Sequence, residues 1–116
     1  MNESIEKKLY SIHTLNEMST VHRNEIIYIE SYGRKIHFYV KDEIYTVNGK
    51  LDEVERCLND RNFLRIHKSF LINMRFIEKM KCYQVYLKTG FVLPISKARY
   101  IDVRETYLFW KELFVD

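Results

Sequence analysis

The sequence predicts a mainly β fold with short α-helices, built as one domain over residues 1–116. The length of 116 residues is close to the modal size of a single domain. Hydrophobic residues make up 47% of the chain and aromatic residues 15%, which is enough to build a core. Three glycines and one proline separate stretches in which apolar and polar residues mostly alternate, a pattern typical of half-buried strands.

Strands are expected in four runs of the first half, at residues 8–15, 26–30, 36–41 and 44–47. The run at 26–30 is dense in β-branched and aromatic side chains. Residues 31–35 are polar and predict a turn, which makes a hairpin with Arg34 and Lys35 at its tip. A second turn is expected at Asp42 and Glu43.

Residues 51–58 predict an amphipathic helix, because the hydrophobic period changes after Gly49. Leu51, Val54 and Leu58 recur at i, i+3 and i+7, while the residues between them are mostly charged. This spacing places one apolar face against the sheet. We expect Cys57 to lie on the flank of that face as a buried, unreactive thiol.

Further strands are expected at residues 63–66, 77–83, 85–88 and 91–95, with Pro94 favouring a sheet edge. A strand that continued through Lys68 would put its charge on the same face as Leu64 and Ile66. We therefore expect the chain to turn at residues 67–69 and to expose Lys68.

A helix is expected near the C-terminus. Apolar residues at Ala98, Ile101, Leu108 and Phe109 follow its period, and Ser96 stands where an N-cap would. The expected helix start carries Lys97 and Arg99. Because a helix N-terminus favours anions, phosphate contact there would gain support from backbone N–H groups.

The charge is unevenly distributed. The total is +3, but residues 1–60 carry 8 basic and 11 acidic side chains, residues 61–104 carry 10 and 2, and residues 105–116 carry 1 and 3. The middle block is therefore strongly basic and still rich in apolar residues, which favours a folded surface that faces polyanions.

Several classes of protein are disfavoured. The sequence contains no Gly-rich phosphate loop, no GxSxG motif and no paired metal-ligand spacing, so we predict no enzyme, cofactor or metal site. Cys57 and His67 could be proposed as nucleophile and base, but an inert thiol is the favoured interpretation. Two cysteines without CxxC spacing and the lack of a long apolar run indicate a cytoplasmic protein with no membrane segment.

Two blocks of the sequence resemble the LytTR family of DNA-binding domains. They are Phe-x-Arg-x-His-Lys-Ser at residues 63–69, with its apolar continuation, and Pro-Ile-Ser-Lys at residues 94–97. Together with the hairpin and the 51–58 helix they extend the resemblance over residues 8–108. The resemblance implies elongated β-sheet layers and no helix-turn-helix. It also implies loops that enter successive major grooves of duplex DNA, and pairing on repeated half-sites by a chain that is a monomer or weak dimer when free.

Site residues follow from the same resemblance. The residues implied to contact bases are Lys68, Lys97, Lys35 and Arg34, and those implied to contact the DNA backbone or to brace loops are Arg65, His67, Ser69, Ser96 and Arg99. The sequence departs from some members at Ala98, where a histidine can stand, so a contact from that position is in doubt. The tyrosines at positions 28, 39, 45 and 86 alternate with aliphatic residues, which favours sheet packing over base stacking.

The predicted function is that of a sequence-specific DNA-binding domain of a bacterial transcriptional regulator, the output module of a two-component response regulator. A receiver domain before Met1 is compatible with this prediction, and so is a free-standing regulator. The alternative is a protein-interaction module or a stand-alone antagonist that pairs with another regulator, a role to which the acidic 51–58 helix and the basic block could both contribute.

Overall fold

The computed structural model describes residues 8–114 and confirms the mainly β class; residues 1–7 and 115–116 of the expected domain lie outside the described residues. The described elements are β1 (Leu9–His13), β2 (Met18–His22), η1 (Arg23–Glu25), β3 (Ile26–Tyr32), β4 (Lys35–Val40), β5 (Glu43–Asn48), α2 (Leu51–Leu58), β6 (Phe63–His67), β7 (Phe70–Asn73), η2 (Met74–Phe76), β8 (Ile77–Lys81), β9 (Gln84–Leu87), β10 (Val92–Pro94), η3 (Lys97–Arg99) and α3 (Tyr100–Phe114). The η segments are short 3-10 turns. The molecule is flattened, with extents of 40 × 36 × 24 Å.

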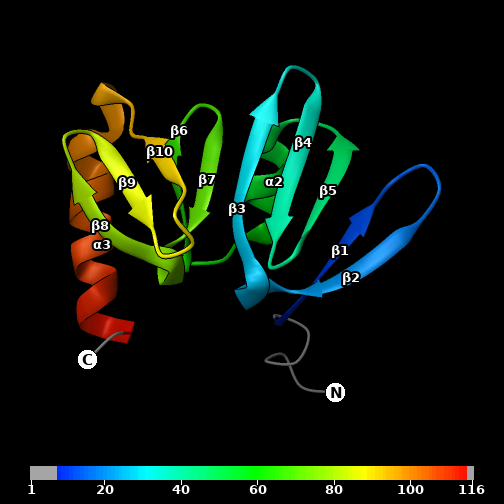
Figure 1. Cartoon of the computed structure of the whole chain (residues 1–116), viewed down its shortest axis with the longest axis horizontal. Helices are drawn as coiled ribbons and strands as arrows, with labels where there is room; N and C mark the ends of the chain where they lie inside the picture. The colour runs from blue at the N-terminus through cyan, green and yellow to red at the C-terminus, as the bar shows by residue number, and fades with distance from the viewer. Residues whose placement is uncertain (1–7, 115–116) are drawn as a thin grey trace.

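The described strands form three antiparallel sheets (Figure 1). The central sheet has five strands in the order β5-β4-β3-β7-β6, so β3 lies in its middle. A two-stranded sheet, β1-β2, lies at one end of the molecule, and a three-stranded sheet, β10-β9-β8, lies at the other with α3 along it. Pro94 belongs to β10, an edge strand, as predicted from its missing N–H.

The central sheet separates two hydrophobic cores. Side chains on one face of β3 join the three-stranded sheet and α3, and those on the other face join α2 and the β1-β2 hairpin. Ile26, Ile27, Tyr28 and Ile29 are therefore all buried, two on each side. This explains why residues 26–29 are all apolar and do not alternate with polar residues, as expected for a stretch of strand covered on both faces.

Helix α2 has the predicted bounds, and Leu51 and Leu58 are buried against the sheet. The prediction that Cys57 is buried is wrong, because its side chain is exposed. Successive helical residues are separated by about 100° around the axis, so the residue before Leu58 points away from the face that Leu58 buries.

The start of the C-terminal helix also differs from the prediction. The Ser96 side chain caps no N–H group, and Lys97 to Arg99 form a 3-10 turn before α3 begins at Tyr100. The N–H of Arg99 donates to the carbonyl oxygen of Ser96 at 3.1 Å. Lys97 and Arg99 thus lie ahead of α3 and not in its first turn.

The buried face of α3 is not the one that its apolar period indicates. Val103 and Trp110 are 2% and 5% exposed, whereas Ile101 and Phe109 are 62% and 63% exposed. The indole N–H of Trp110 donates to Asn62 Oδ1 at 2.9 Å, which fixes this face of the helix toward the core. The face with Ile101 and Phe109 is consequently left outside.

Two local features of the N-terminal half differ from expectation. Strand β2 was not predicted, and Val21 is its one buried residue, so its sequence carries little apolar signal. The β3-β4 turn is shorter than the polar stretch suggested, since it contains only Gly33 and Arg34. Lys35 is therefore the first residue of β4 and not part of the turn. No helix among residues 8–114 is long and apolar enough to cross a membrane.

Candidate nucleic-acid interface

The segments predicted to contact DNA gather at one edge of the molecule, the upper edge in Figure 1. They are the turn between β3 and β4, the turn between β6 and β7, and η3. The basic residues exposed by these segments and by the first residue of β4 are Arg34, Lys35, Lys68, Lys97 and Arg99. We call this set the basic edge. It places side chains from positions 34 to 99 of the chain on one surface.

Backbone hydrogen bonds join the segments of the basic edge to one another. The N–H of Ser31 in β3 donates to the carbonyl oxygen of Ser69 at 2.9 Å, which ties the first hairpin to the β6-β7 turn. The N–H of Ser96 donates to the carbonyl oxygen of Ile66 at 3.0 Å, which ties η3 to the same turn. The relative positions of the three segments are thus set by main-chain contacts and not by flexible side chains.

Arg65 braces the β6-β7 turn from inside. Its Nε donates to the carbonyl oxygen of His67 at 2.7 Å, and one of its terminal nitrogens donates to that of Lys68. The other terminal nitrogen lies 2.8 Å from Asp52 and 2.9 Å from Glu55 on α2. Because the Arg65 side chain is only 9% exposed and its donors are engaged, its geometry is that of a loop brace.

Asp52 and Glu55 of α2 supply the negative charges that pair with Arg65. The Arg65 guanidinium, through a hydrogen bond and its charge, holds the pKa of the Asp52 carboxyl below its usual range, and the charges of Arg99 and Arg56 act in the same direction. Asp52 therefore remains ionised at neutral pH beside the basic edge. Its charge orients Arg65. Neither Lys68 nor Lys97 forms an ion pair with a carboxylate of residues 8–114.

His67 supports the turn through its ring. Its Nδ1 accepts a hydrogen bond from the N–H of Ser69 at 3.1 Å, so the neutral ring carries its proton on Nε2. Burial lowers the pKa of His67 from 6.5, and the charges of Lys68, Arg99 and Arg65 lower it further. The ring is therefore neutral at physiological pH in the free protein.

The hydroxyl of Ser96 does not face outward. Its Oγ is buried and has no hydrogen-bond partner among the described residues. What Ser96 supplies to the basic edge is its backbone N–H, through the bond to Ile66.

A fourth turn joins the same edge and was not predicted as part of the site. It connects β8 and β9 through Cys82 and Tyr83, both of which have positive φ. The carbonyl oxygen of Tyr83 accepts from the N–H of Ile95 at 2.8 Å, next to Ser96. Lys81 is exposed at the start of this turn. The cluster of lysines at positions 79 and 81 was the available sequence signal.

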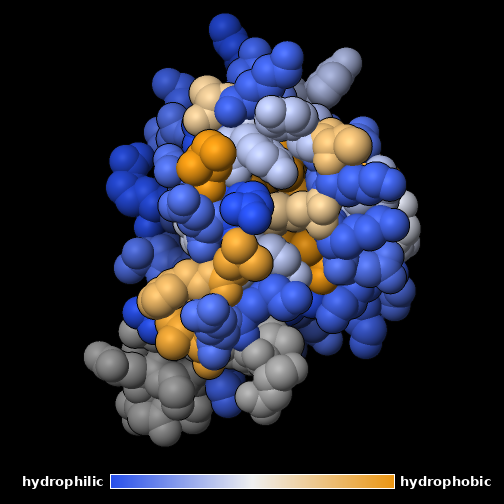
Figure 2. Space-filling view, turned by 90° about the vertical axis from the view of Figure 1, so that its left-hand side faces the viewer, coloured by the Kyte–Doolittle hydropathy of each residue, from blue (hydrophilic) through white to orange (hydrophobic). Residues whose placement is uncertain are grey.

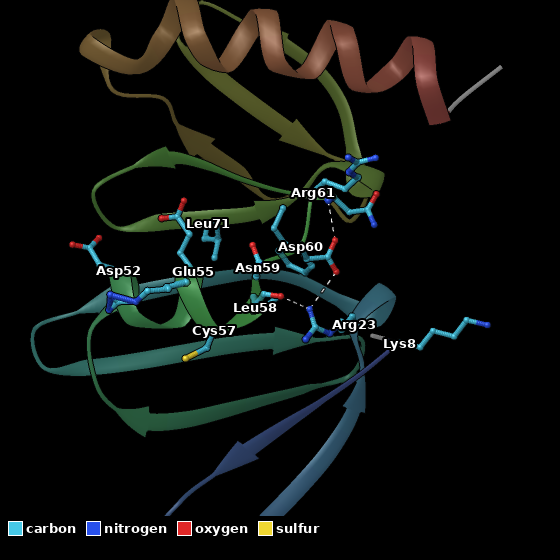
Figure 3. A pocket seen from close by; sticks show the side chains of 13 residues that line it. Lys8, Arg23, Asp52, Glu55, Cys57, Leu58, Asn59, Asp60, Arg61 and Leu71 are labelled. Atoms are coloured by element: carbon cyan, nitrogen blue, oxygen red, sulfur yellow. Dashed lines mark hydrogen bonds and ion pairs between the residues drawn. The ribbon is translucent and has the colours of Figure 1, made fainter. Parts of the chain in front are cut away.

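A cavity lies elsewhere, between α2, η1 and the residues that follow α2 (Figure 3). Its volume is about 1170 Å³. Arg23 crosses it, donates to the carbonyl oxygen of Leu58 and lies 3.5 Å from Asp60. Cys57 lines this cavity but His67 does not, and the His67 ring is already bonded to Ser69. The two residues therefore do not form the nucleophile and base considered from the sequence.

Two of the four tyrosines considered for base stacking pack within the fold. Tyr28 is buried and stacks on Tyr39 with ring centroids 4.2 Å apart. The phenol of Tyr39 donates to Glu30 at 3.1 Å. Among residues 8–114, no group of three or more His, Cys, Asp or Glu side chains is arranged to hold a metal ion.

Known proteins match this chain in sequence and in fold. The sequence model of the LytTR DNA-binding domain matches residues 16–107, which is most of the chain. The chain belongs to the LytTR family of DNA-binding domains. A LytTR DNA-binding domain from Bacillus cereus has the same fold, with a TM-score of 0.73, 20% identity, and coverage of 85% of this chain and 95% of that one.

Curated relatives of this LytTR domain are regulatory proteins. The sensory transduction protein LytT of Bacillus subtilis is 29% identical over 67% of this chain, and the same protein of Enterococcus faecalis is 28% identical over 70%. The transcriptional regulatory protein NatR of Bacillus subtilis is 29% identical over 70% of the chain. The aligned parts cover 34%, 36% and 34% of these proteins, so the chain spans about one third of their length.

Proposed function

We propose that this LytTR domain binds duplex DNA in a sequence-specific manner by inserting the turns of the basic edge into successive major grooves. Lys68 and Lys97 contact bases, and Arg34 or Lys35 adds a third contact from the hairpin. Arg99 contacts phosphate. Arg65, His67, Ser69 and Ser96 brace the turns, the last two through their backbone.

The observation that carries the proposal is the linkage of the turns by the Ser31–Ser69 and Ser96–Ile66 hydrogen bonds. Specific recognition requires that donors keep fixed positions relative to one another, since a misplaced side chain loses its base contact. Lysines on a linked set of turns meet this requirement, whereas lysines on independent loops would supply mainly electrostatic attraction.

The side chains fit the chemistry of the major groove. Lys and Arg donate to the O6 and N7 acceptors of guanine, which is the commonest base-specific contact and contributes about 1–3 kcal/mol of discrimination. Flanking arginines such as Arg99 position a protein on phosphates without reading sequence. The separation of the exposed lysines onto different turns suits contacts to separate base pairs.

The length of the relatives supports a place in a larger regulator. Because the chain spans about one third of LytT and NatR, we propose that it acts as the output module of a response regulator and binds repeated half-sites in pairs. The input that controls it would then come from the other part of the regulator.

The test begins with a duplex selected from random sequences by the wild-type chain. Fluorescence anisotropy then compares Lys97→Ala with Lys88→Ala, a change at an exposed lysine that follows β9, at the end of the three-stranded sheet opposite the β8-β9 turn. We expect Lys97→Ala to lose about 1–3 kcal/mol on the selected duplex and to relax preference at one base pair. Lys88→Ala should bind as the wild type does.

Two outcomes would contradict the proposal. Equal affinity of the wild type for the selected and a scrambled duplex would exclude sequence-specific binding. A flat dependence of log affinity on log salt concentration would exclude phosphate contact and would favour a protein partner.

A further inference from the structure

The outer face of α3 is a surface that neither core uses. Ile101, Leu108, Phe109 and Leu113 are 62%, 46%, 63% and 56% exposed along this one helix. Figure 2 shows apolar side chains gathered among charged ones on the side of the molecule that α3 occupies. Four large exposed apolar residues on one helix are an unusual concentration. Exposed apolar patches of this kind commonly mark contact surfaces.

Charges flank this face in an ordered way. Ile101 and Leu108 are seven residues apart and so lie almost in line along the helix. At 3.6 residues per turn, Arg104 and Lys111 lie roughly 40–60° to one side of Leu108, and Glu105 and Glu112 lie roughly 40–60° to the other. The apolar line therefore has one basic flank and one acidic flank. Figure 1 shows α3 at the rim of the molecule, with no sheet beyond it.

We propose that this face binds the same face of a second copy of the chain, with the two α3 helices parallel about a two-fold axis. In that arrangement, the axis places the basic flank of one helix beside the acidic flank of the other. Arg104 meets Glu105 of the second copy, and Lys111 meets Glu112. Antiparallel pairing would instead place like charges together, which is unfavourable.

The same arrangement covers Ile101, Leu108 and Phe109, whereas Leu113 lies about 140° from Leu108 around the helix and stays outside the pair. Leu108 packs on its own counterpart, and Ile101 does the same. Phe109 lies beyond the acidic flank, where the aliphatic stems of Arg104 and Lys111 from the second copy lie across it. A single pair of helices buries less than the 1,200–2,000 Å² of typical stable interfaces, so the dimer is weak in free solution and forms at high concentration.

A parallel pair also suits DNA, and this step rests on the proposed function. Segment η3 joins the basic edge directly to the first turn of α3. An axis parallel to α3 therefore turns the basic edges of both copies in the same direction. Both edges can then face one duplex, which a pair with antiparallel helices would not allow.

Sedimentation velocity without DNA, up to millimolar protein, tests the dimer. The variants are Glu105→Lys/Glu112→Lys and Arg104→Glu/Lys111→Glu, and Asp42→Lys/Glu53→Lys is the control with the same change in charge at exposed positions off α3. We expect each α3 variant alone to dimerise at least about tenfold more weakly, and an equimolar mixture of the two to recover wild-type association. Circular dichroism melting checks that each variant folds.

Cysteine cross-linking tests the orientation. In a Cys57→Ser/Cys82→Ser background, Ile101→Cys should be cross-linked by a short bismaleimide, because parallel pairing brings the two copies of position 101 together. Thr106→Cys, on the same helix but off this face, should not. A wild-type chain that stays monomeric at millimolar concentration, or charge variants that associate as the wild type does, would overturn the proposal. Cross-linking at both cysteines or at neither would overturn the parallel orientation.

The dimer and the proposed function fail separately. A wild-type chain that dimerises but prefers no duplex would overturn the proposed function and leave the dimer standing. A chain that binds a single half-site specifically but never associates would overturn the dimer and leave the proposed function standing.

Discussion

The guanidinium of Arg65 holds the main chain of Lys68, since one terminal nitrogen donates to the Lys68 carbonyl oxygen at 2.5 Å. A second donor, Nε, holds the carbonyl oxygen of His67 at 2.7 Å. The turn that presents Lys68 is therefore fixed from beneath by the residue three positions earlier, and Arg65 is itself fixed by Asp52 and Glu55. If Lys68 contacts a base, Arg65 acts on DNA through position and not through its own charge.

Arg65→Lys separates the positioning of the β6-β7 turn by Arg65 from the effect of its positive charge. The change keeps the positive charge but removes the planar set of donors that grips two carbonyl oxygens at once. Hydrogen bonds that involve a charged group contribute about 1.5–3 kcal/mol, so we expect specific DNA affinity to fall by about tenfold or more while the salt dependence stays the same. Anisotropy titrations at several salt concentrations measure both quantities.

Arg75→Lys is the matched control, because Arg75 is exposed in η2 away from the basic edge. It should bind DNA as the wild type does. Amide hydrogen exchange should also report faster exchange at Ser69 in Arg65→Lys. An unchanged affinity with unchanged exchange would show that the turn needs no brace.

The pKa of His67 should rise when DNA binds. In the free protein, burial and the charges of Lys68, Arg99 and Arg65 lower this pKa. Phosphates near these residues would offset their charges and so favour the protonated ring. Because the bound state then has the higher pKa, it takes up protons, and affinity should increase as the pH falls from about 8 to about 6.

NMR titration of the His67 ring in the free and bound protein measures the shift directly, and it resolves this ring from the other histidines. His67→Gln keeps a side chain that can accept a hydrogen bond from Ser69 and should flatten the pH dependence of affinity. A bound-state pKa equal to or below that of the free protein would show that phosphates do not approach this turn.

Ser96→Ala distinguishes a helix-capping role of the Ser96 side chain from a role of its backbone N–H alone. Replacing a serine that caps a helix N-terminus by alanine lowers the stability of the protein by about 0.5–2 kcal/mol. In the structure the Ser96 hydroxyl is buried without a partner, so its removal should leave the free energy of unfolding unchanged or increase it. Urea denaturation measures this.

DNA affinity should also survive Ser96→Ala, because the contribution of Ser96 to the basic edge is its backbone N–H. Thr106→Ala provides the control for a hydroxyl lost from an exposed position. A clear loss of stability would restore the capping role, and a loss of affinity without a loss of stability would indicate that the hydroxyl reaches DNA.

Local patterns in the sequence were enough to predict the elements whose position depends on residues close together in the chain. The bounds of α2 followed from the spacing of Leu51, Val54 and Leu58, and the β6-β7 turn followed from the cost of placing Lys68 on an apolar face. Strand β2 was missed because Val21 is its one buried side chain, and it is held by pairing with β1, which lies nine residues earlier.

Features decided by tertiary contacts could not be predicted. Helix α3 has apolar residues on two faces, and only the position of the core determines that Val103 and Trp110 are buried. The bonds from Ser31 to Ser69 and from Ser96 to Ile66 join residues far apart in the chain and have no signature in composition or period. The sequence could therefore indicate which side chains form the candidate site, but not how their turns are held together.

Lys68 and Arg99 should differ in the kind of DNA contact that they lose. If Arg99 contacts phosphate, Arg99→Gln should weaken binding to the selected and scrambled duplexes alike and reduce the slope of log affinity against log salt by about one. If Lys68 contacts a base, Lys68→Ala should cost about 1–3 kcal/mol on the selected duplex and much less on the scrambled one. Titrations of both variants on both duplexes at several salt concentrations make the comparison, with Lys88→Ala as the control for a lysine lost away from the basic edge. Uniform weakening by both variants would show that Lys68 contributes charge alone, and base readout would then have to come from Lys97 and the hairpin.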